Sequence, residues 1–429
     1  MAVRVSDNNR FLQHRDGTPF FYLADTAWEL FHRLSYDEAS DYLQDRAAKG
    51  FTAIQCVALA ELDGVRTPNR NGDTPFIGDD PAKPNEAYWL HVDRVVARIA
   101  ELGMVAALLP TWGDKWNKGG WGVGPEIFTP ETARAYGQWI GERYKNAPAL
   151  IWVLGGDRKI ESNEHREIIR AMAAGIAHGD NKAHLQTFHP QGQFTSSTEF
   201  HDDDWLAFNM YQTGHSYDRD NYRSIAEDYA LDPPKPCLDS EPGYEDHPNA
   251  FNRETGYMDD YECRKFLWWA TLAGACGHTY GCHDIWQFFG ATPAPGVNFP
   301  RTPWRDAMGL PGAAQMQHGK NALLARSYFS RVPDQSVVVS DTFDGEQVRT
   351  HHIQASRCEN GAYVLVYSAS GQPFTVDMTK LRGSATGAWL NPRTSTIKEC
   401  GTFDNAGTQE FVPPSKGRGS DWVLTLDVV

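Results

Sequence analysis

Residues 149–157 read Ala-Leu-Ile-Trp-Val-Leu-Gly-Gly-Asp, an apolar run that stops at two glycines and a carboxylate. A second segment of similar design, residues 236–242, reads Pro-Cys-Leu-Asp-Ser-Glu-Pro. Short apolar runs bounded by turn residues are typical of buried parallel strands. In a closed barrel of such strands, the side chains that follow the strand ends gather at one rim, where barrel enzymes have their active sites. The two segments therefore predict that Asp157 and Glu241 share a site.

Strand-like and helix-like segments alternate along the first 330 residues, which predicts parallel βα units. A Ser35-x-x-Glu38 capping box marks the start of the first helix, which stops at Gly50. The spacing between Asp157 and Glu241 is close to three barrel units of about 31 residues each, so strands four and seven carry them. The expected strands are residues 20–24, 52–59, 104–110, 149–154, 184–189, 206–211, 235–239 and 274–280. Further helices are expected at residues 86–102, 130–144, 163–178 and 261–272.

Beyond residue 330 the pattern changes to short runs of period two with turn residues between them, which is typical of an antiparallel β-sandwich. We therefore expect a (β/α)8 TIM barrel over residues 1–330 and a small antiparallel β-sandwich over residues 331–429. Structural support for the barrel is the expected role of the second domain, and a sugar-binding role stays open. The expected sandwich strands are residues 336–339, 362–367, 374–377, 387–390 and 422–426.

Composition limits the classes of partner. The formal net charge of −15 disfavours nucleic acid and anionic membranes, which both bind positively charged surfaces. The 14 Trp, 17 Tyr and 21 Phe offer apolar ring faces for sugar rings, although core packing explains many of them equally well. An uncharged oligosaccharide or glycoside is the expected substrate, and the sequence does not predict an oligomeric state.

The seven cysteines form no C-x-x-C pair, so reduced thiols are expected, with a Cys358–Cys400 disulfide as the alternative. The N-terminal residues lack the apolar core of a signal peptide, and no stretch reaches the roughly 18 apolar residues of a membrane span. A cytoplasmic location is therefore expected, unless a leader has been removed.

Cleavage of a glycosidic bond needs one carboxylic acid that protonates the leaving oxygen and one carboxylate that attacks C1 or activates water. Asp157 follows two small residues that allow a tight turn, and Glu241 precedes a Pro-Gly pair that ends its strand at once. A helix cap or turn carboxylate is the structural alternative for each acid. The context of both favours display at the rim, and we take Asp157 and Glu241 as the catalytic pair.

Polar and aromatic side chains at the other strand ends are suited to binding sugar hydroxyls and ring faces, although ordinary rim packing explains any one of them equally well. Three tryptophans, Trp28, Trp112 and Trp286, are candidates for the floor of the sugar pocket. The further candidates are Asp25, Asp114, His189, Asn209, Tyr211, His278, Tyr280 and His283.

A metal site is the competing interpretation of the histidines, since His278, His283 and Asp284 are close in sequence and His189 or His215 could complete a ligand set. No H-E-x-x-H pair is present, and neutral histidine also serves as a hydrogen-bond partner for hydroxyls. A serine triad is disfavoured because no G-x-S-x-G segment occurs. We expect no metal and no cofactor.

Four segments together resemble the apiosidase-like glycoside hydrolases, which pair a DUF4038-type TIM barrel with a collagen-binding-like β-sandwich. The resemblance extends from residues 25–28 (Asp-Thr-Ala-Trp) through the C-terminal domain. It implies Asp157 as acid/base and Glu241 as nucleophile, and it adds Gln212 and His215 to the substrate-binding candidates. The segments are residues 154–157 (Leu-Gly-Gly-Asp), 212–215 (Gln-Thr-Gly-His), 239–242 (Asp-Ser-Glu-Pro) and 277–281 (Gly-His-Thr-Tyr-Gly).

The sequence departs from larger groups of barrel glycosidases, which carry Asn-Glu at strand four where this chain has Gly156-Asp157. The family contains more than apiose-cleaving enzymes, so its name does not give the substrate. We expect a retaining glycoside hydrolase with carboxyl groups about 5–5.5 Å apart. The rival interpretation is a non-catalytic carbohydrate-binding barrel.

Overall fold

A computed structural model describes residues 3–340 and 350–429. Eight parallel strands form the barrel, in the order β8-β7-β6-β5-β4-β11-β10-β9 around the sheet. The ring closes where Ala207 N donates to Gln186 O at 2.8 Å, just before β9. The barrel strands are β4 (Tyr22–Ala27), β5 (Ala53–Val57), β6 (Val105–Leu109), β7 (Leu150–Gly155), β8 (Gln186–His189), β9 (Asn209–Tyr211), β10 (Cys237–Asp239) and β11 (Gly277–Tyr280).

Every residue of these eight strands is buried, as expected of parallel strands with a packed interior and helices outside. The predicted barrel is thus confirmed, with strands shorter than expected at some ends. The N-terminal residues add a small antiparallel sheet that the sequence analysis did not predict, formed by β1 (Val3–Val5), β2 (Leu12–His14) and β3 (Pro19–Phe20).

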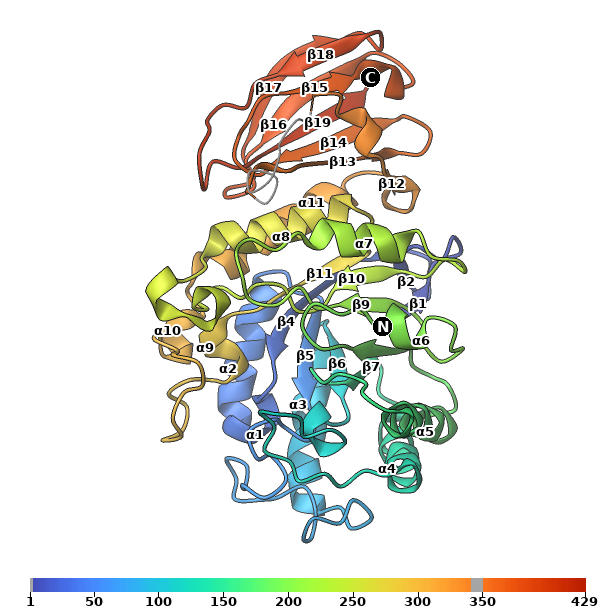
Figure 1. Cartoon of the computed structure of the whole chain (residues 1–429), viewed down its shortest axis with the longest axis vertical. Helices are drawn as coiled ribbons and strands as arrows, with labels where there is room; N and C mark the ends of the chain where they lie inside the picture. Colours follow the sequence, from blue (N-terminus) through green and yellow to red (C-terminus); the bar gives the residue numbers. More distant parts are fainter. Residues whose placement is uncertain (1–2, 341–349) are drawn as a thin grey trace.

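Helices cover the outside of the barrel (Figure 1). The predicted capping box is present, because Ser35 Oγ accepts from Glu38 N and the Glu38 carboxylate accepts from Ser35 N. The helices are α1 (Leu30–Arg33), α2 (Tyr36–Ala48), α3 (Glu86–Glu101), α4 (Pro130–Tyr144), α5 (Asn163–Gly179), α6 (Ser197–Phe200), α7 (Asn221–Tyr229), α8 (Asp260–Leu272), α9 (His283–Trp286), α10 (Trp304–Ala307) and α11 (Pro311–Leu324). Among the described residues, no helix has both the length and the apolar character needed to cross a membrane.

The C-terminal region is the predicted antiparallel sandwich. A six-stranded sheet in the order β12-β13-β14-β19-β16-β17 faces the pair β15-β18 across an apolar core. The strands are β12 (Arg331–Pro333), β13 (Ile353–Cys358), β14 (Tyr363–Ser368), β15 (Phe374–Asp377), β16 (Ala385–Leu390), β17 (Ile397–Phe403), β18 (Thr408–Phe411) and β19 (Trp422–Val428).

One expected sandwich strand, residues 336–339, is wrong. The Asp334 side chain accepts a hydrogen bond from Ser336 N and closes a 3-10 turn at Gln335–Val337, so the local side-chain bond replaces strand pairing. Pairing is confined to the end of the segment, where Val338 bridges to Val376 and Val339 N donates to Thr375 O at 2.9 Å. All seven cysteines are free, so the alternative Cys358–Cys400 disulfide is absent.

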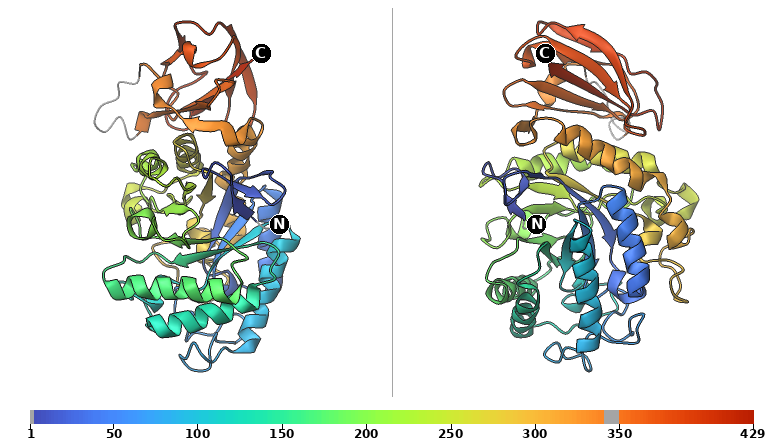
Figure 2. Two further views of the ribbon diagram at one scale, coloured as in Figure 1. Left: turned by 90° about the vertical axis from the view of Figure 1, so that its right-hand side faces the viewer. Right: turned by 180° about the vertical axis from the view of Figure 1, so that it is seen from behind.

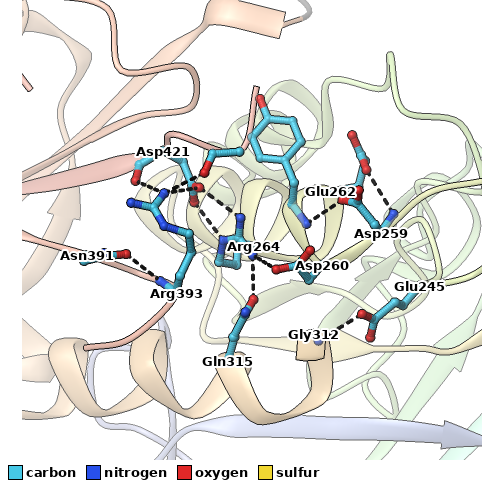
Figure 3. A network of polar contacts seen from close by, with 12 residues as sticks. Glu245, Asp259, Asp260, Glu262, Arg264, Gly312, Gln315, Asn391, Arg393 and Asp421 are labelled. Atoms are coloured by element: carbon cyan, nitrogen blue, oxygen red, sulfur yellow. Dashed lines mark hydrogen bonds and ion pairs between the residues drawn. The ribbon is translucent and has the colours of Figure 1, made fainter. Parts of the chain in front are cut away.

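The sandwich rests on α7, α8 and α11 (Figures 1 and 2). At the centre of this contact, Asp421 lies between Arg264 of α8, at 3.0 Å through two nitrogens, and Arg393 of the sandwich, at 3.0 Å (Figure 3). Asp421 is fully buried and Arg264 is 2% exposed. Beside them the ring of Trp268 stacks on that of Tyr367. The buried Asp421 carboxylate, which accepts hydrogen bonds from both arginines, thus joins the two domains.

We predict that Asp421→Ala lowers the free energy of unfolding by about 3 kcal/mol or more, because it leaves two guanidinium groups without their buried counter-ion. Asp427→Ala is the matched control, since Asp427 pairs with Arg326 across the same interface but its side chain is 45% exposed. The control should cost about 1 kcal/mol or less. Urea denaturation followed by tryptophan fluorescence measures both, and equal losses would contradict the assignment.

Candidate active site

A cavity of about 630 Å³ lies at the carboxyl ends of the barrel strands and contains both predicted acids. Its wall is formed by segments that lie at or follow the ends of all eight strands, and residues 191–193 are the segment that follows β8. The lining side chains include Trp28, Glu61, Trp112, Trp121, Asp157, Gln212, His215, Arg219, Glu241, Tyr244, His247, Phe251, His283 and Trp286.

Asp157 is positioned by a tight turn after β7. Gly155 and Gly156 both have a φ of 98°, a region that favours glycine. The backbone of Gly156 also packs closely against the loop after β6, where Gly113 N donates to Gly156 O at 3.0 Å. A Cβ on Gly156 would lie 2.6 Å from Gly113 N. The two glycines therefore let the chain turn at once and present the Asp157 carboxyl to the cavity.

The Asp157 carboxyl is held in an environment that favours its protonated form. Burial and the negative charge of Glu241 raise its pKa to about 6, against the opposing effect of Arg158. The Arg158 guanidinium lies 3.6 Å from Asp157 Oδ2 and beneath the ring of Trp121. The Asp157 side chain keeps 22% of its surface exposed, so a ligand in the cavity can reach it.

Glu241 follows β10 and is held by two imidazoles. His189 Nε2 lies 3.1 Å from one carboxylate oxygen, and His215 Nε2 lies 3.2 Å from the other. Burial alone would raise the pKa of Glu241, but the contacts with the two histidines outweigh it and lower the pKa to about 2. The pKa values of two carboxyl groups that ordinarily have similar acid strength are thus shifted in opposite directions. This is the pattern expected of an acid and a nucleophile in one site.

Aromatic rings line the cavity beside the Glu241 carboxylate. The rings of Trp28 and Trp112 lie 5.1 Å apart, and both contact the ring of His189. Trp286 donates through Nε1 to His283 Nδ1 at 3.3 Å. These rings offer flat apolar faces next to a charged group, as binding of a sugar ring requires.

Three imidazoles, His215, His247 and His283, line another part of the wall. The ring of His247 lies 4.3 Å from each of the other two. Burial lowers the pKa of His247 well below its ordinary value and that of His283 to about 4. His247 Nδ1 bonds to Pro248 O at 2.7 Å, which leaves Nε2 of the neutral ring as an acceptor. Hydroxyl groups are suitable partners for such a ring.

The structure brings eight of the predicted site residues together on the cavity wall, and His189 contacts Glu241 from behind it. The eight are Trp28, Trp112, Asp157, Gln212, His215, Glu241, His283 and Trp286. The other candidates do not line the cavity, and these are Asp25, Asp114, Asn209, Tyr211, His278 and Tyr280.

Two of these six are acids paired with buried cations. Asp25 contacts Arg46 at 2.5 Å and accepts from Tyr42 at 2.7 Å. Asp114 pairs with Lys115 at 2.6 Å and also accepts from backbone amides of its own loop. Both carboxylates are fully buried, so they stabilise the packed protein around β4 and the loop after β6 and do not face a ligand.

The remaining four point into the packed protein. Tyr280 donates to Glu245 at 2.5 Å, and Asn209 contacts Ser196 and His201. His278 is fully buried, and burial lowers its pKa to about 3. The Tyr211 carbonyl accepts from Ser240, and the residue as a whole is 8% exposed.

Sequence reasoning missed several residues that line the cavity, among them Glu61, Trp121, Tyr244 and His247. Tyr244 and His247 lie in the loop that begins at Glu241, so following that loop would have found them. Glu61 comes two residues after the expected end of the second strand. Among residues 3–340 and 350–429, no group of three or more His, Cys, Asp or Glu side chains is arranged to hold a metal ion.

Comparison with known proteins agrees with this architecture. Residues 6–330 match the model of the apiosidase-like catalytic domain, and residues 332–427 match that of a collagen-binding-like domain described from a collagenase. The chain belongs to the apiosidase-like family. It is a glycosidase. No protein of curated function matches the chain.

Two solved structures of glycoside hydrolases are similar to this apiosidase-like chain over its full length. A family 5 glycoside hydrolase from Bacteroides vulgatus is 33% identical with a TM-score of 0.89, covering 100% of this chain and 93% of its own. A second glycoside hydrolase is 32% identical with a TM-score of 0.85, covering 100% and 97%. A family 5 mannosidase from Rhizomucor miehei, at 14% identity and a TM-score of 0.54 over 76% of this chain and 97% of its own, shares the fold.

We predict that Gly156→Ala lowers the melting temperature of this apiosidase-like protein by at least about 5 °C, because the substitution adds both backbone strain and a clash with Gly113. Gly120→Ala is the control, since a Cβ there has open space around it. Differential scanning calorimetry measures both variants. Equal melting temperatures for Gly156→Ala and the wild type would contradict the proposed role of the turn.

Proposed function

We propose that this protein is a retaining glycoside hydrolase in which Glu241 is the nucleophile and Asp157 the acid/base. The observation that carries the proposal is the pair of carboxyl groups in one cavity with oppositely shifted pKa values, about 6 for Asp157 and about 2 for Glu241. Between these values the first is protonated and the second is charged. That is the state in which a retaining glycosidase begins its cycle.

In the first step, a Glu241 carboxylate oxygen attacks the anomeric carbon while the Asp157 proton passes to the glycosidic oxygen. The bond between that carbon and oxygen breaks, and the leaving alcohol departs. Glu241 becomes an uncharged ester, so the charge that raised the pKa of Asp157 disappears. Asp157 therefore becomes a stronger acid in the intermediate and stays ionised.

In the second step, the ionised Asp157 takes a proton from water, and the water oxygen attacks the anomeric carbon. The ester bond to Glu241 breaks, and the carboxylate returns to its position between His189 and His215. The histidines favour the charged carboxylate and thereby favour its departure from the sugar. Both catalytic residues end in their starting states, and the sugar keeps its anomeric configuration.

The expected substrate is an oligosaccharide or a glycoside. The cavity combines tryptophan faces with neutral imidazoles and three carboxyl groups, which suits a ring that carries several hydroxyl groups. The side chain of Asp157 is one methylene shorter than the glutamate of other barrel glycosidases. We infer that the leaving oxygen approaches the end of β7 closely.

A panel of aryl pentofuranosides, pentopyranosides and hexopyranosides tests the assignment. Glu241→Gln should lower kcat by more than about 10⁴-fold on every glycoside that the wild type cleaves. Asp157→Asn should lower it by about 10²- to 10⁴-fold where the leaving group is poor and far less where it is good, because a good leaving group needs no proton. Glu254→Gln, an exposed acid outside the cavity, is the control, and unchanged turnover in Glu241→Gln would contradict the proposal.

The pH dependence follows from the same two groups. On a substrate with a poor leaving group, kcat/KM should rise with deprotonation of Glu241 near pH 2 and fall with deprotonation of Asp157 near pH 6. His215→Ala removes one contact that lowers the pKa of Glu241, so the acidic limb should move to higher pH. Initial rates across pH 3 to 9 measure the basic limb in both proteins and show whether the acidic limb of His215→Ala has moved above pH 3. A His215→Ala variant with no acidic limb in this range would contradict the role of this contact.

A further inference from the structure

A third carboxyl group, that of Glu61, lines the same cavity as Asp157 and Glu241. It lies in the segment after β5, between the strand ends that carry Trp28 and Trp112. Those two rings lie 5.1 Å apart and both contact His189, which in turn contacts Glu241. Glu61 therefore shares one cavity with the proposed nucleophile and with both tryptophan rings.

The backbone around Glu61 is fixed from both sides. Lys115 Nζ donates to Ala60 O at 3.0 Å, and Leu62 N donates to the buried carboxylate of Glu29 at 3.2 Å. Gly64 packs against the same turn, where a Cβ would lie 2.6 Å from Ala60 N. Contacts on each side of Glu61 thus hold the turn, and the side chain projects from a rigid support.

The Glu61 carboxyl itself has no hydrogen-bond or ion-pair partner among the described residues. Its neighbours differ in this respect, since Glu29 contacts His32 and Asp114 contacts Lys115. A partly buried carboxyl without a protein partner is costly unless water or a ligand satisfies it. Its position on the cavity wall leaves it available to a bound molecule.

The charges around Glu61 favour its neutral form. Burial and the charge of Asp157 raise its pKa to about 8, with further negative charge nearby and only Arg158 acting in the opposite direction. At neutral pH the group is therefore a carboxylic acid that can both donate and accept a hydrogen bond. The charged groups that face it are Asp157, Arg158, Asp114 with its partner Lys115, and Glu29 with its partner His32.

We infer that Glu61 binds a hydroxyl group of the sugar whose glycosidic bond is cleaved, and so helps to select that sugar. This inference rests on the proposed function. A hydroxyl both donates and accepts, and it matches a carboxylic acid in both respects. A sugar that carries a hydrogen at that position would leave the acid without a partner, which is the basis of strong discrimination in enzyme sites.

The experiment is a double-mutant cycle in which Glu61 is replaced in the enzyme and single hydroxyl groups are removed from the substrate. It uses the aryl glycoside that the wild type cleaves fastest and the monodeoxy analogues of that glycoside. Glu61→Ala should lower kcat/KM on the parent glycoside by about 10- to 100-fold. For one monodeoxy analogue, the one that lacks the hydroxyl bound by Glu61, the same substitution should cause no further loss. Asp63→Asn, in the same turn but outside the cavity, is the control and should match the wild type.

Two results would overturn the inference: kcat/KM of Glu61→Ala within twofold of the wild type on the parent, or an equal loss on the parent and every analogue. The second result would show a merely structural role. Glu241→Gln is measured in parallel, because its loss of turnover supports the proposed function whatever Glu61 does. Turnover that persists in Glu241→Gln would instead contradict the proposed function.

A second measurement needs no substrate. Because the pKa of Glu61 is higher in the folded than in the unfolded chain, the folded protein keeps a proton that the unfolded chain has lost between about pH 4.5 and pH 8. This group therefore lowers the stability of the wild type increasingly as pH rises through that range. The melting temperature of Glu61→Gln should exceed that of the wild type by a margin that grows from pH 5 to pH 8. A margin independent of pH would contradict the neutral carboxyl.

Discussion

The contact of the Glu241 carboxylate with His189 and His215 is the interaction on which the rest of the site depends. It keeps Glu241 charged in a buried position, and burial together with that charge raises the pKa of Asp157 to about 6. The two histidines come from the ends of β8 and from the segment after β9, and Glu241 follows β10. Closure of the barrel between β8 and β9, together with the pairing of β9 and β10, brings these three strand ends to one point. The fold therefore places the charged group on which the chemistry depends.

The barrel could be predicted because its strands are buried on both sides and therefore stand out as continuous apolar runs. Capping signals such as the Ser35 capping box marked where helices begin. The sandwich was harder, because strands like β17 (Ile397–Phe403) are exposed along their length and carry no apolar pattern. Residues 336–339 look like a strand in sequence, yet the side chain of Asp334 turns the chain there. Whether such a local hydrogen bond forms depends on the backbone geometry, which the pattern of apolar residues does not reveal.

The catalytic candidates came from residues at or just after strand ends, and eight residues of the cavity wall, including both acids, could be found in that way. The failures have two physical causes. Asp25 lies inside β4 and Tyr280 ends β11, and their side chains are bound within the protein by Arg46 and Glu245. Glu61 and His247 lie in loops, whose paths depend on contacts distant in sequence. Prediction from sequence therefore fails on two points: the direction in which a side chain at the rim points, and the path that a long loop takes.

The measurement that tests the account most directly is the mass of the enzyme after reaction with an activated 2-deoxy-2-fluoro glycoside of the sugar that it cleaves. The fluorine slows both steps, and a good leaving group restores the first, so a glycosyl-enzyme accumulates. The account predicts a mass increase of one glycosyl unit, located by peptide mapping on Glu241. A glycosyl unit on another residue, or hydrolysis with inverted configuration and no labelled protein, would contradict it.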